Sequence, residues 1–429
     1  MTSATSLPLH QQAYSLQHDQ FANLLAQTQN LLIIQDLDGV CMGLVKDPLN
    51  RQINPAYVNA TQAFDKHFYV LTNGEHIGLR GVNGIIERAF GSTAHVRENG
   101  YYLPGLAAGG VQWQNRYGGI SHPGVSEAEL TFLSKVPDRI RATLKTFAGE
   151  HALSLDDATL DHCIQASALD NLASPTANLN TFHGALKGNR VTYVALQKAM
   201  QALMDALLSE AANKGLESSF FVHYAPNHGR DPQGKEIIWF SQEDESGTTD
   251  FQFMLRGAIK EAGVLALLNR YYAEQIGDYP LGRDFNARQA PHDHETLLKL
   301  VKTHFDPSHM PLIVGVGDTV TSKVDTLDGQ LVIKRGGSDR NFLQLIQDIG
   351  KAFDTGNVVV YVDSSRGELK NRQALRIEMT GEFKRVVAGP GDPLDKTDPL
   401  VLNVAFPGGH HEYATMFQAA ANQRRLSSN

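Results

Sequence analysis

Cysteine and long apolar runs are both scarce in this 429-residue chain. The two cysteines, Cys41 and Cys163, lie far apart and form no CxxC pair, which argues against a disulfide framework. A reducing, cytoplasmic compartment is therefore expected. No apolar run reaches about 18 residues, so no membrane span is expected. The N-terminus also lacks the basic start and apolar stretch of a secretory signal.

Basic residues are outnumbered and are not gathered into blocks. The chain has 38 Lys and Arg against 46 Asp and Glu, a formal net charge of -8. This balance argues against a nucleic-acid partner and against an anionic membrane surface. It leaves room for a small anionic substrate, and a hydrophobic content of 42% is enough for a sizeable core.

Short apolar runs alternate with helical patterns along much of the chain. Strands are predicted at 31–36 (LLIIQD), 68–71 (FYVL), 310–318 (MPLIVGVGD), 329–336 and 357–363, and helices at 20–28 and 341–353. This alternation predicts an α/β fold with a doubly wound, Rossmann-like parallel sheet. In such sheets ligands bind at the carboxyl ends of the strands, where three of these runs end in polar residues.

A long stretch between the second and third of these strands has its own pattern. A helix is predicted at 190–215, strands at 218–226 and 235–242, and one helix at 251–277, or two helices broken near Gly263. We interpret this stretch as an inserted α/β cap domain, with a permuted tandem domain as the alternative. The predicted domains are 1–119 (core, first part), 120–285 (cap, substrate specificity) and 286–429 (core, second part).

The segment Asp36-Leu37-Asp38-Gly39-Val40 follows the first buried strand. Residues i and i+2 of extended backbone point to the same side, so Asp36 and Asp38 can face one ligand. A divalent cation relieves the repulsion of two such carboxylates, and Mg²⁺ prefers hard oxygen ligands. Asp318, at the end of another strand, is a third candidate ligand.

The strand end at 68–71 carries candidate phosphate-binding groups. The hydroxyl of Thr72 and the turn amides of Asn73 and Gly74 are placed to donate hydrogen bonds to a phosphoryl oxygen, although Asn-Gly is also a common turn pair. The segment VGVGDT around Asp318 is not a dinucleotide-binding fingerprint, because the GxGxxG pattern is incomplete.

These motifs resemble those of the haloacid dehalogenase-like phosphatases. HVRENGYYLPG (95–105) and SSFFVHYAP (218–226) resemble segments of members with a C2-type cap that act on sugar phosphates. Within that superfamily, LLIIQDLDGVCM, HFYVLTNGEHIGLRGV and VGVGDTVTSKVD are similar to the glucosylglycerol 3-phosphate phosphatases. The likeness extends over most of the chain. It implies a Mg²⁺-dependent phosphoric monoester hydrolase that makes a compatible solute for salt tolerance.

The resemblance also implies roles for individual residues. Asp36 is the implied nucleophile, which forms an aspartyl phosphate, and Asp38 the implied general acid and base. The implied ligands of Mg²⁺ are Asp36, the backbone carbonyl of Asp38, and Asp318. Thr72 is implied to bind the transferred phosphoryl group, and the implied partner is a small-molecule sugar phosphate, with possible association with the upstream synthase.

The sequence departs from the superfamily pattern in two places. Four and five residues after Asp318, where another acid is usual, stand Ser322 and Lys323. The lysine that normally neutralises the phosphoryl charge is also missing, because His294 stands near its expected position. Lys187, Lys323 and Arg288 are the predicted substitutes, in that order.

Other residues are weaker candidates. His223 and Tyr224, on a predicted cap strand, are candidates for contact with a sugar hydroxyl or for ordinary packing. The pair His410-His411 fits a loop better than a metal site, because neighbouring side chains diverge.

Three alternatives to the main hypothesis remain open at this level. Sucrose phosphate, trehalose phosphate and mannosylglycerate phosphate require the same chemistry with a different sugar. A glycosyltransferase with a DxD metal motif and a non-catalytic binding protein are different classes, and the position of DLD after the first core strand argues against the former.

Overall fold

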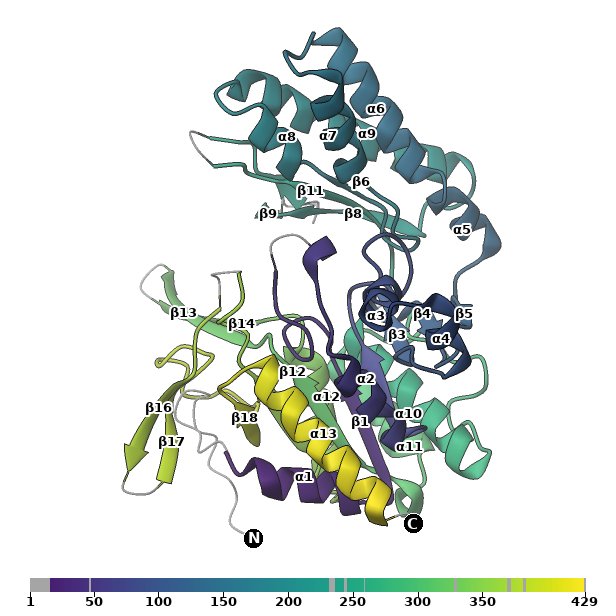
Figure 1. Cartoon of the computed structure of the whole chain (residues 1–429), viewed down its shortest axis with the longest axis vertical. Coiled ribbons are helices and arrows are strands. Elements are labelled where there is room, and N and C mark those ends of the chain that lie inside the picture. Colours follow the sequence, from purple (N-terminus) through teal and green to yellow (C-terminus); the bar gives the residue numbers. More distant parts are fainter. Residues whose placement is uncertain are drawn as a thin grey trace. The chain divides into compact units, whose positions relative to one another are not determined.

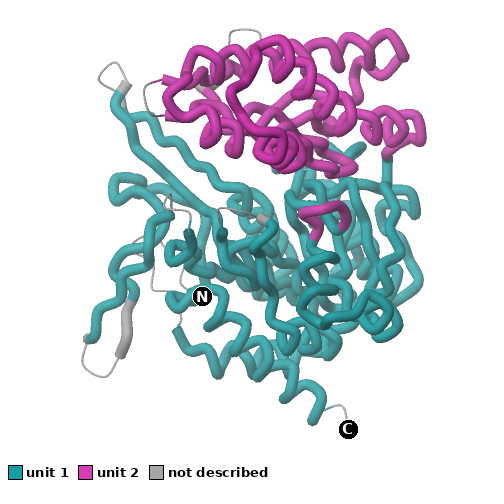
Figure 2. Tube along the Cα trace, turned by 45° about the horizontal axis from the view of Figure 1, so that its top comes forward, with its two compact units in different colours: residues 1–76, 82–124, 258–429 teal, residues 77–81, 125–257 magenta. Residues whose placement is uncertain are grey.

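The computed structural model describes residues 16–45, 48–230, 236–242, 245–257, 259–327, 330–368, 372–380 and 383–427. The chain forms two compact units (Figure 2). Unit 1 consists of Met1–His76, Val82–Gly124 and Ala258–Asn429, and unit 2 of Ile77–Gly81 and Val125–Gly257. The predicted cap segment, 120–285, therefore overlaps unit 2, but residues 120–124 and 258–285 of it belong to unit 1.

An eight-stranded mixed sheet forms the centre of unit 1 among the described residues (Figure 1). Its strand order is β18-β15-β12-β1-β2-β3-β4-β5. The strands from β18 to β3 pair in parallel, and β4 and β5 continue the sheet in antiparallel fashion. The strands are β1 (Leu31–Gln35), β2 (Phe68–Leu71), β3 (Gly105–Ala107), β4 (Gln112–Gln114), β5 (Ile120–Ser121), β12 (Leu312–Gly317), β15 (Val358–Val362) and β18 (Val404–Phe406).

Helices cover both faces of this sheet, which confirms the doubly wound α/β class. Ile33 of β1 belongs to a core cluster with α1, α2, α3, α4 and α13, whereas its neighbour Ile34 belongs to a second cluster with α10, α11 and α12. This period-two division is what a strand buried on both faces requires. The helices are α1 (His18–Gln27), α2 (Pro55–Thr61), α3 (Val82–Phe90), α4 (Thr93–Glu98), α10 (Lys260–Ile276), α11 (His294–His304), α12 (Arg340–Phe353) and α13 (His410–Ser427).

Smaller elements complete unit 1. Two antiparallel hairpins stand outside the central sheet, β13 (Thr321–Leu327) with β14 (Gln330–Gly336), and β16 (Arg376–Thr380) with β17 (Phe383–Ala388). The run at 329–336, predicted as a sheet strand, is thus the second arm of a hairpin. Short 3₁₀ helices are η2 (Pro48–Asn50), η3 (Gln62–Phe64), η4 (Ala108–Gly110) and η5 (Pro307–His309).

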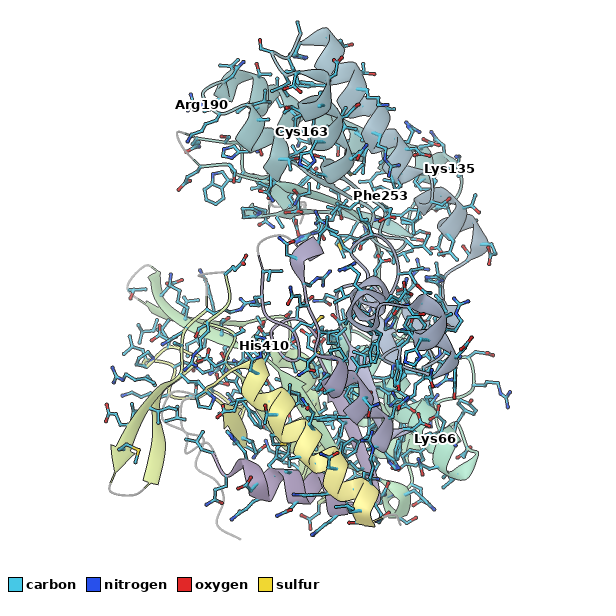
Figure 3. The ribbon with its side chains drawn as sticks, in the orientation of Figure 1. Lys66, Lys135, Cys163, Arg190, Phe253 and His410 are labelled. Carbon is cyan, nitrogen blue, oxygen red and sulfur yellow. The ribbon has the colours of Figure 1, made fainter. Side chains whose placement is uncertain are left out.

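Unit 2 packs helices on a four-stranded antiparallel sheet of order β6-β7-β11-β8. Its strands are β6 (Ala168–Leu169), β7 (Thr176–Asn178), β8 (Phe220–Ala225) and β11 (Asp250–Leu255), with a separate pair β9 (Asn227–Arg230) and β10 (Glu236–Ile238). Its helices are α5 (Glu127–Leu133), α6 (Val136–Glu150), α7 (Asp157–Ser167), α8 (Asn180–Ala185) and α9 (Arg190–Asn213). Cys163 is buried on α7 and Phe253 lies on β11 (Figure 3).

The segment predicted as helix at 251–277 divides into two elements of different type. Phe251, Phe253 and Leu255 are buried with partly exposed residues between them, the alternation of a half-buried strand, and they form β11. The helix α10 begins only at Lys260 and packs on the central sheet of unit 1. The helical prediction for 251–255 was therefore wrong, and α10 belongs to the core rather than to the inserted segment.

Candidate active site

Four neighbouring parallel strands end in polar residues at the same edge of the central sheet. Asp36 follows β1, Thr72 follows β2, Asp318 follows β12 and Asp363 follows β15. The backbone N–H of Asp36 donates to the carbonyl oxygen of Val316 (3.0 Å). The parallel pairing of β1 with β12 therefore extends to Asp36, the nucleophile candidate. The predicted convergence of strand-end residues is thus present in the structure.

Three buried aspartates lie together at this edge. One carboxylate oxygen from each of Asp36, Asp318 and Asp339 lies within 4.8 Å of the others. Their exposed fractions are 6%, 2% and 0%. Burial raises the pKa of Asp36 well above its usual range, and Lys260 offsets only part of this effect. Burial, together with the nearby Asp339 carboxylate, raises the pKa of Asp318 to about 7. Such a cluster requires positive charge nearby to hold all three carboxylates ionised.

Lys260 supplies a buried positive charge to the cluster. Its Nζ lies 2.7 Å from Asp339 Oδ1 and 3.1 Å from Asp36 Oδ2. Burial favours the neutral amine, but the carboxylates of Asp339 and Asp36 outweigh it and raise the pKa of Lys260 above its usual value. Lys260 is therefore protonated, and it contacts Asp36 from the start of α10, although the phosphoryl-neutralising cation was expected near His294.

Asp339 acts on the site by positioning its neighbours. Its Oδ2 accepts hydrogen bonds from the backbone N–H groups of Asp318 (2.9 Å) and Thr319 (3.0 Å), and its Oδ1 accepts from Lys260. Burial acts to raise the pKa of Asp339, but Lys260 and these amides outweigh it, so the pKa lies below its usual value. Asp339 stands 21 residues after Asp318, beyond the β13–β14 hairpin, in place of the acid that the sequence lacks at 322 and 323.

Asp38 faces the loop after β2. Nη1 of Arg51 lies 2.9 Å from Asp38 Oδ2 and 3.1 Å from Asp38 Oδ1. A Cβ placed on Gly74 would lie 4.0 Å from Asp38 Oδ2 and 3.7 Å from Thr72 Oγ1. The carboxylate and the hydroxyl thus border the same small space, as predicted from their strand-end positions. The neighbouring Asn73 is exposed.

Gly39 allows the loop after β1 to approach Asp318. It has a φ of +81°, and a Cβ at this position would lie 2.2 Å from Asp318 Oδ2. Only glycine combines this left-handed backbone with so close an approach. The DLDG segment and the strand β12 are therefore held in contact by backbone geometry rather than by side-chain length.

Two oxygens of the cluster that accept no hydrogen bond fit a hard divalent cation, and Arg372 Nε lies 3.8 Å from one of them, Asp318 Oδ2. Among the described residues, Asp36 Oδ1 and Asp318 Oδ2 are buried and have no hydrogen-bond partner. Leaving such atoms unsatisfied costs free energy, and carboxylate oxygens are the ligands that Mg²⁺ prefers. Both oxygens of Asp339 are already engaged, so Asp36 and Asp318 are the better candidate ligands.

Three of the predicted substitute cations have other partners in unit 1. Lys323 pairs with Asp325 (2.9 Å), Arg288 donates to the carbonyl oxygen of Gly124 (2.8 Å), and His294 Nε2 lies 3.0 Å from Asp348 Oδ2. The predictions for Lys323 and Arg288 are therefore corrected, and the expected position near His294 also lacks this role, because among the described residues Lys260 is the cation paired with Asp36.

The remaining predicted residues belong to unit 2. Lys187 lines a pocket there together with His183 and Arg190, and His223 Nδ1 lies 2.9 Å from the buried Glu236. Their assignment to substrate binding stays a prediction. Tyr224 is buried, in keeping with ordinary packing.

His410 and His411 begin helix α13 rather than forming part of a loop (Figure 3). The His410 ring lies against Gly43, where a Cβ would approach it to 3.1 Å. Burial lowers the pKa of His410 to about 4, so the ring is neutral and packs beside the loop that carries Asp38.

Comparison with known proteins identifies the family. A family model described as glucosylglycerol-phosphate phosphatase matches residues 30–421. The glucosylglycerol-phosphate phosphatase of Synechocystis sp. is 60% identical over 418 residues, which cover 97% of this chain and 99% of that protein. The chain belongs to the glucosylglycerol-phosphate phosphatase family.

Two solved structures cover nearly the whole chain at low similarity. The C-terminal domain of trehalose-6-phosphate phosphatase from C. albicans is 10% identical with a TM-score of 0.41, covering 96% of this chain and 98% of that one. Trehalose-6-phosphate phosphatase from Aspergillus fumigatus is 9% identical with a TM-score of 0.36, covering 96% and 100%.

The glucosylglycerol-phosphate phosphatase match spans both units and every residue of the carboxylate cluster. No helix among the described residues is long and apolar enough to cross a membrane. Lys260, Asp339 and Arg51 were missed by the sequence reasoning. For Lys260 the available signal was the period-two pattern of 251–255, which would have placed this lysine at the start of a helix.

Proposed function

We propose that this chain is a Mg²⁺-dependent phosphatase that hydrolyses glucosylglycerol 3-phosphate to glucosylglycerol and phosphate. The observation that carries the proposal is the family match over nearly the full length, joined to a carboxylate cluster at the strand ends that it spans. The proposed substrate is a glycosylated glycerol phosphate, so a synthase that catalyses glycosyl transfer must supply it. Two points stay predictions: physical association with the upstream synthase, and a cytoplasmic location.

In the proposed mechanism Asp36 attacks the phosphorus atom. A bond forms between a carboxylate oxygen of Asp36 and phosphorus, and the bond from phosphorus to the glycerol oxygen breaks. Asp38, which must be protonated when the substrate binds, transfers that proton to the leaving oxygen. When bound, Mg²⁺ supplies charge neutralisation to the phosphoryl oxygens. Lys260, fixed by Asp339, holds positive charge beside Asp36, where the phosphoryl group arrives.

The second step returns the enzyme to its starting state. Asp38, now ionised, takes a proton from a water molecule that attacks the aspartyl phosphate. The bond between Asp36 and phosphorus breaks, which releases inorganic phosphate. The Thr72 hydroxyl borders the same space as the Asp38 carboxylate and is placed to donate to a phosphoryl oxygen in both steps.

Arg51 holds the Asp38 carboxylate through two contacts from Nη1. A guanidinium beside an anionic substrate also attracts its phosphate. We assign to Arg51 the orientation of Asp38, which must lie within reach of the leaving oxygen to act on it.

Substituting Asp36 tests the nucleophile. We expect Asp36→Asn to lower kcat for glucosylglycerol 3-phosphate by more than about 10³-fold, because an amide is a poor nucleophile of nearly the same shape. Phosphate release measures the rate, and circular dichroism checks the fold. Asp278→Asn, at an exposed position in the loop after α10, is the matched control and should keep full activity.

Trapping separates a covalent from a direct mechanism. Quenched wild-type enzyme should carry one acid-stable, hydroxylamine-sensitive phosphoryl group, mapped by mass spectrometry to the peptide that contains Asp36. Substantial turnover by Asp36→Asn, or label on another residue, contradicts the assignment.

A substrate panel tests the sugar. We expect kcat/KM for glucosylglycerol 3-phosphate to exceed that for sucrose, trehalose and mannosylglycerate phosphates by at least about tenfold, a difference of about 1.4 kcal/mol in transition-state stabilisation. Equal values would leave the phosphatase chemistry intact but contradict the proposed substrate.

A further inference from the structure

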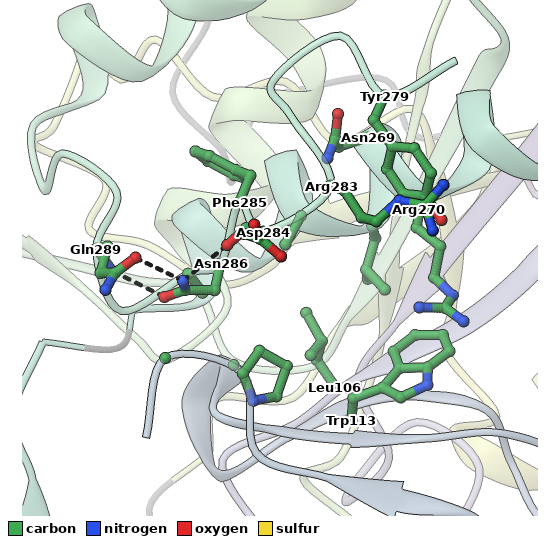
Figure 4. Close-up of a pocket in the computed structure, with 16 residues that line it drawn as sticks. Leu106, Trp113, Asn269, Arg270, Tyr279, Arg283, Asp284, Phe285, Asn286 and Gln289 are labelled. Atoms are coloured by element: carbon green, nitrogen blue, oxygen red, sulfur yellow. Dashed lines mark hydrogen bonds between the residues drawn. The ribbon is translucent and has the colours of Figure 1, made fainter. Parts of the chain in front are cut away.

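Unit 1 contains a cavity that none of the residues of the carboxylate cluster lines. Its volume is about 390 Å³, and strands β3 and β4, helix α10 and the loop after α10 surround it (Figure 4). This volume lies in the range of pockets that bind small organic molecules. We call it the α10 pocket.

The interior of the α10 pocket is largely apolar. Leu106 of β3, Leu267 of α10 and Phe285 of the following loop line it together with Trp113 of β4. The Arg270 guanidinium lies 3.7 Å from the centre of the Trp113 ring and covers one face of it, and Arg270 Nε also pairs with Glu274 (3.1 Å). This stacking fixes the indole and keeps its position without a ligand.

Charged side chains on the lining are predominantly positive. The charged residues of the lining are two cations, Arg270 and Arg283, and one carboxylate, Asp284. Arg283 lies over the Tyr279 ring at 5.4 Å and has no ion pair with any residue for which the structure gives a position. A cation free of a carboxylate partner, beside an apolar interior, fits a ligand that has an apolar body and an anionic group.

The loop that carries Arg283 is held in place by its own contacts. Asn286 Nδ2 donates to Gln289 Oε1 (2.8 Å), and Arg288 Nη1 donates to the carbonyl oxygen of Gly124 (2.8 Å). Gly124 has a φ of +73°, and a Cβ there would lie 2.3 Å from Asn286 Oδ1. The wall is therefore built before any ligand arrives. Gly124 is also the last residue of unit 1 before the chain enters unit 2.

We propose that the α10 pocket is a binding site for a small amphipathic anion, separate from the catalytic site. The apolar body of the ligand contacts Leu106, Phe285 and the edge of Trp113, and its carboxylate or phosphate pairs with Arg283. A ligand there also contacts the Pro123–Gly124 segment, which lines the pocket and leads into unit 2, so the site is suited to an effector.

The chain offers its own reporter for this site. It has two tryptophans, Trp113 and Trp239, so Trp239→Phe leaves Trp113 as the sole indole. In the full-length Trp239→Phe protein, we expect 3-phenylpropanoate to change Trp113 fluorescence saturably. The uncharged 3-phenylpropan-1-ol, which has the same ring and chain length, should bind at least about fivefold more weakly.

Substitutions test whether Arg283 binds the anionic group of the ligand. In the Trp239→Phe background, Arg283→Gln should weaken binding of 3-phenylpropanoate about tenfold and leave the alcohol unchanged, whereas Asp284→Asn should tighten binding of the anion. Arg139→Gln, an exposed arginine of unit 2, is the charge-matched control. Asp36→Asn should leave the dissociation constant unchanged, which separates this site from the catalytic one.

Three outcomes would overturn the proposal. The first is an unsaturable response of Trp113 to the anion. The second is equal affinity for the anion and the alcohol, and the third is a loss of affinity in Asp36→Asn. Thermal unfolding of each variant shows whether the fold is retained. Because none of these measurements uses turnover, the test stands apart from the test of the phosphatase function.

Discussion

At the scale of single residues, the site depends on one buried lysine shared by two aspartates. Lys260 Nζ contacts Asp339 and Asp36 at 2.7 and 3.1 Å, and all three side chains are almost fully buried. A buried charge is tolerated only when it is paired, so Lys260 and Asp339 hold each other in the charged state, and Lys260 offsets part of the cost of ionising Asp36. The lysine is thus required by the carboxylates even before a substrate phosphate arrives.

Replacing this lysine should separate its catalytic role from its structural one. Lys260→Met should lower kcat by about 10²–10³-fold, because positive charge beside the phosphoryl group is lost. It should also lower the free energy of unfolding by about 3–5 kcal/mol, because two buried carboxylates lose their partner. Phosphate release and urea unfolding measure the two effects.

The double variant Lys260→Met with Asp339→Asn is the control for stability. It removes the opposing charges together, so stability should return in part while activity stays low. Recovery of activity in the double variant would show that Lys260 acts through folding alone.

The carboxylate cluster should bind Mg²⁺ with a measurable gain in stability. A cation that binds only the folded state stabilises it by about 2.7 kcal/mol at 100 times its dissociation constant. We expect Mg²⁺ to raise Tm of the wild type and EDTA to abolish activity. Asp318→Asn should lose most of the Mg²⁺-dependent rise, while Asp278→Asn should keep it. An equal rise in Asp318→Asn would exclude Asp318 as a ligand.

Sequence reasoning located the strand-end residues but not the residues that organise them. Asp36, Thr72 and Asp318 follow strands built mostly of apolar residues, and adjacent parallel strands bring such ends together. Asp339 could not be found by spacing, because the β13–β14 hairpin separates it from Asp318. Lys260 was hidden because 251–277 was interpreted as continuous helix.

At the scale of secondary-structure elements, helices α11 and α12 are joined by a titratable pair. His294 at the start of α11 contacts Asp348 of α12 at 3.0 Å. The hydrogen bond to Asp348 raises the pKa of His294 above its usual value. Burial acts to raise the pKa of Asp348, but hydrogen bonds from His294, Lys351 and Gln347 outweigh it and lower the pKa to about 2.

This pair predicts a stability difference that depends on pH. Because the pKa of His294 is higher in the folded state, its charge stabilises the fold fully below the unfolded pKa of about 6.5. This stabilisation is lost as the pH rises through the pKa of His294 in the folded state. The lowered pKa of Asp348 contributes above about pH 4. His294→Gln should therefore cost up to about 1 kcal/mol at pH 5.5 and less at pH 8.5, measured by urea unfolding.

Lys351→Gln is the control for this prediction. Lys351 contacts the same carboxylate (Lys351 Nζ to Asp348 Oδ1, 3.0 Å), but its own charge does not change between pH 5.5 and 8.5. Its effect should be the same at both values. An equal cost of His294→Gln at the two pH values would show that the imidazole contributes by packing rather than by charge.

At the scale of the whole molecule, the division into units follows where apolar residues cluster. Both large hydrophobic clusters around the central sheet consist of unit 1 residues from three separate chain segments. The sequence predicted a cap at 120–285 because this long gap between two core strands has its own pattern of helices and strands, and unit 2 comprises Val125–Gly257 with Ile77–Gly81. The predicted segment includes α10, which belongs to unit 1, because apolar spacing alone does not show which sheet a helix packs on.

This organisation predicts that unit 1 folds without the inserted segment. Replacing 125–257 by a Gly/Ser linker, with Ile77–Gly81 retained as a loop, leaves both clusters intact, so thermal unfolding should remain cooperative. We propose that unit 2 determines the sugar preference. The shortened protein should then hydrolyse 4-nitrophenyl phosphate within about tenfold of the wild-type rate, while kcat/KM for glucosylglycerol 3-phosphate falls by at least about 10²-fold. A cooperative fold that loses both activities would show instead that unit 2 is needed for the chemistry itself.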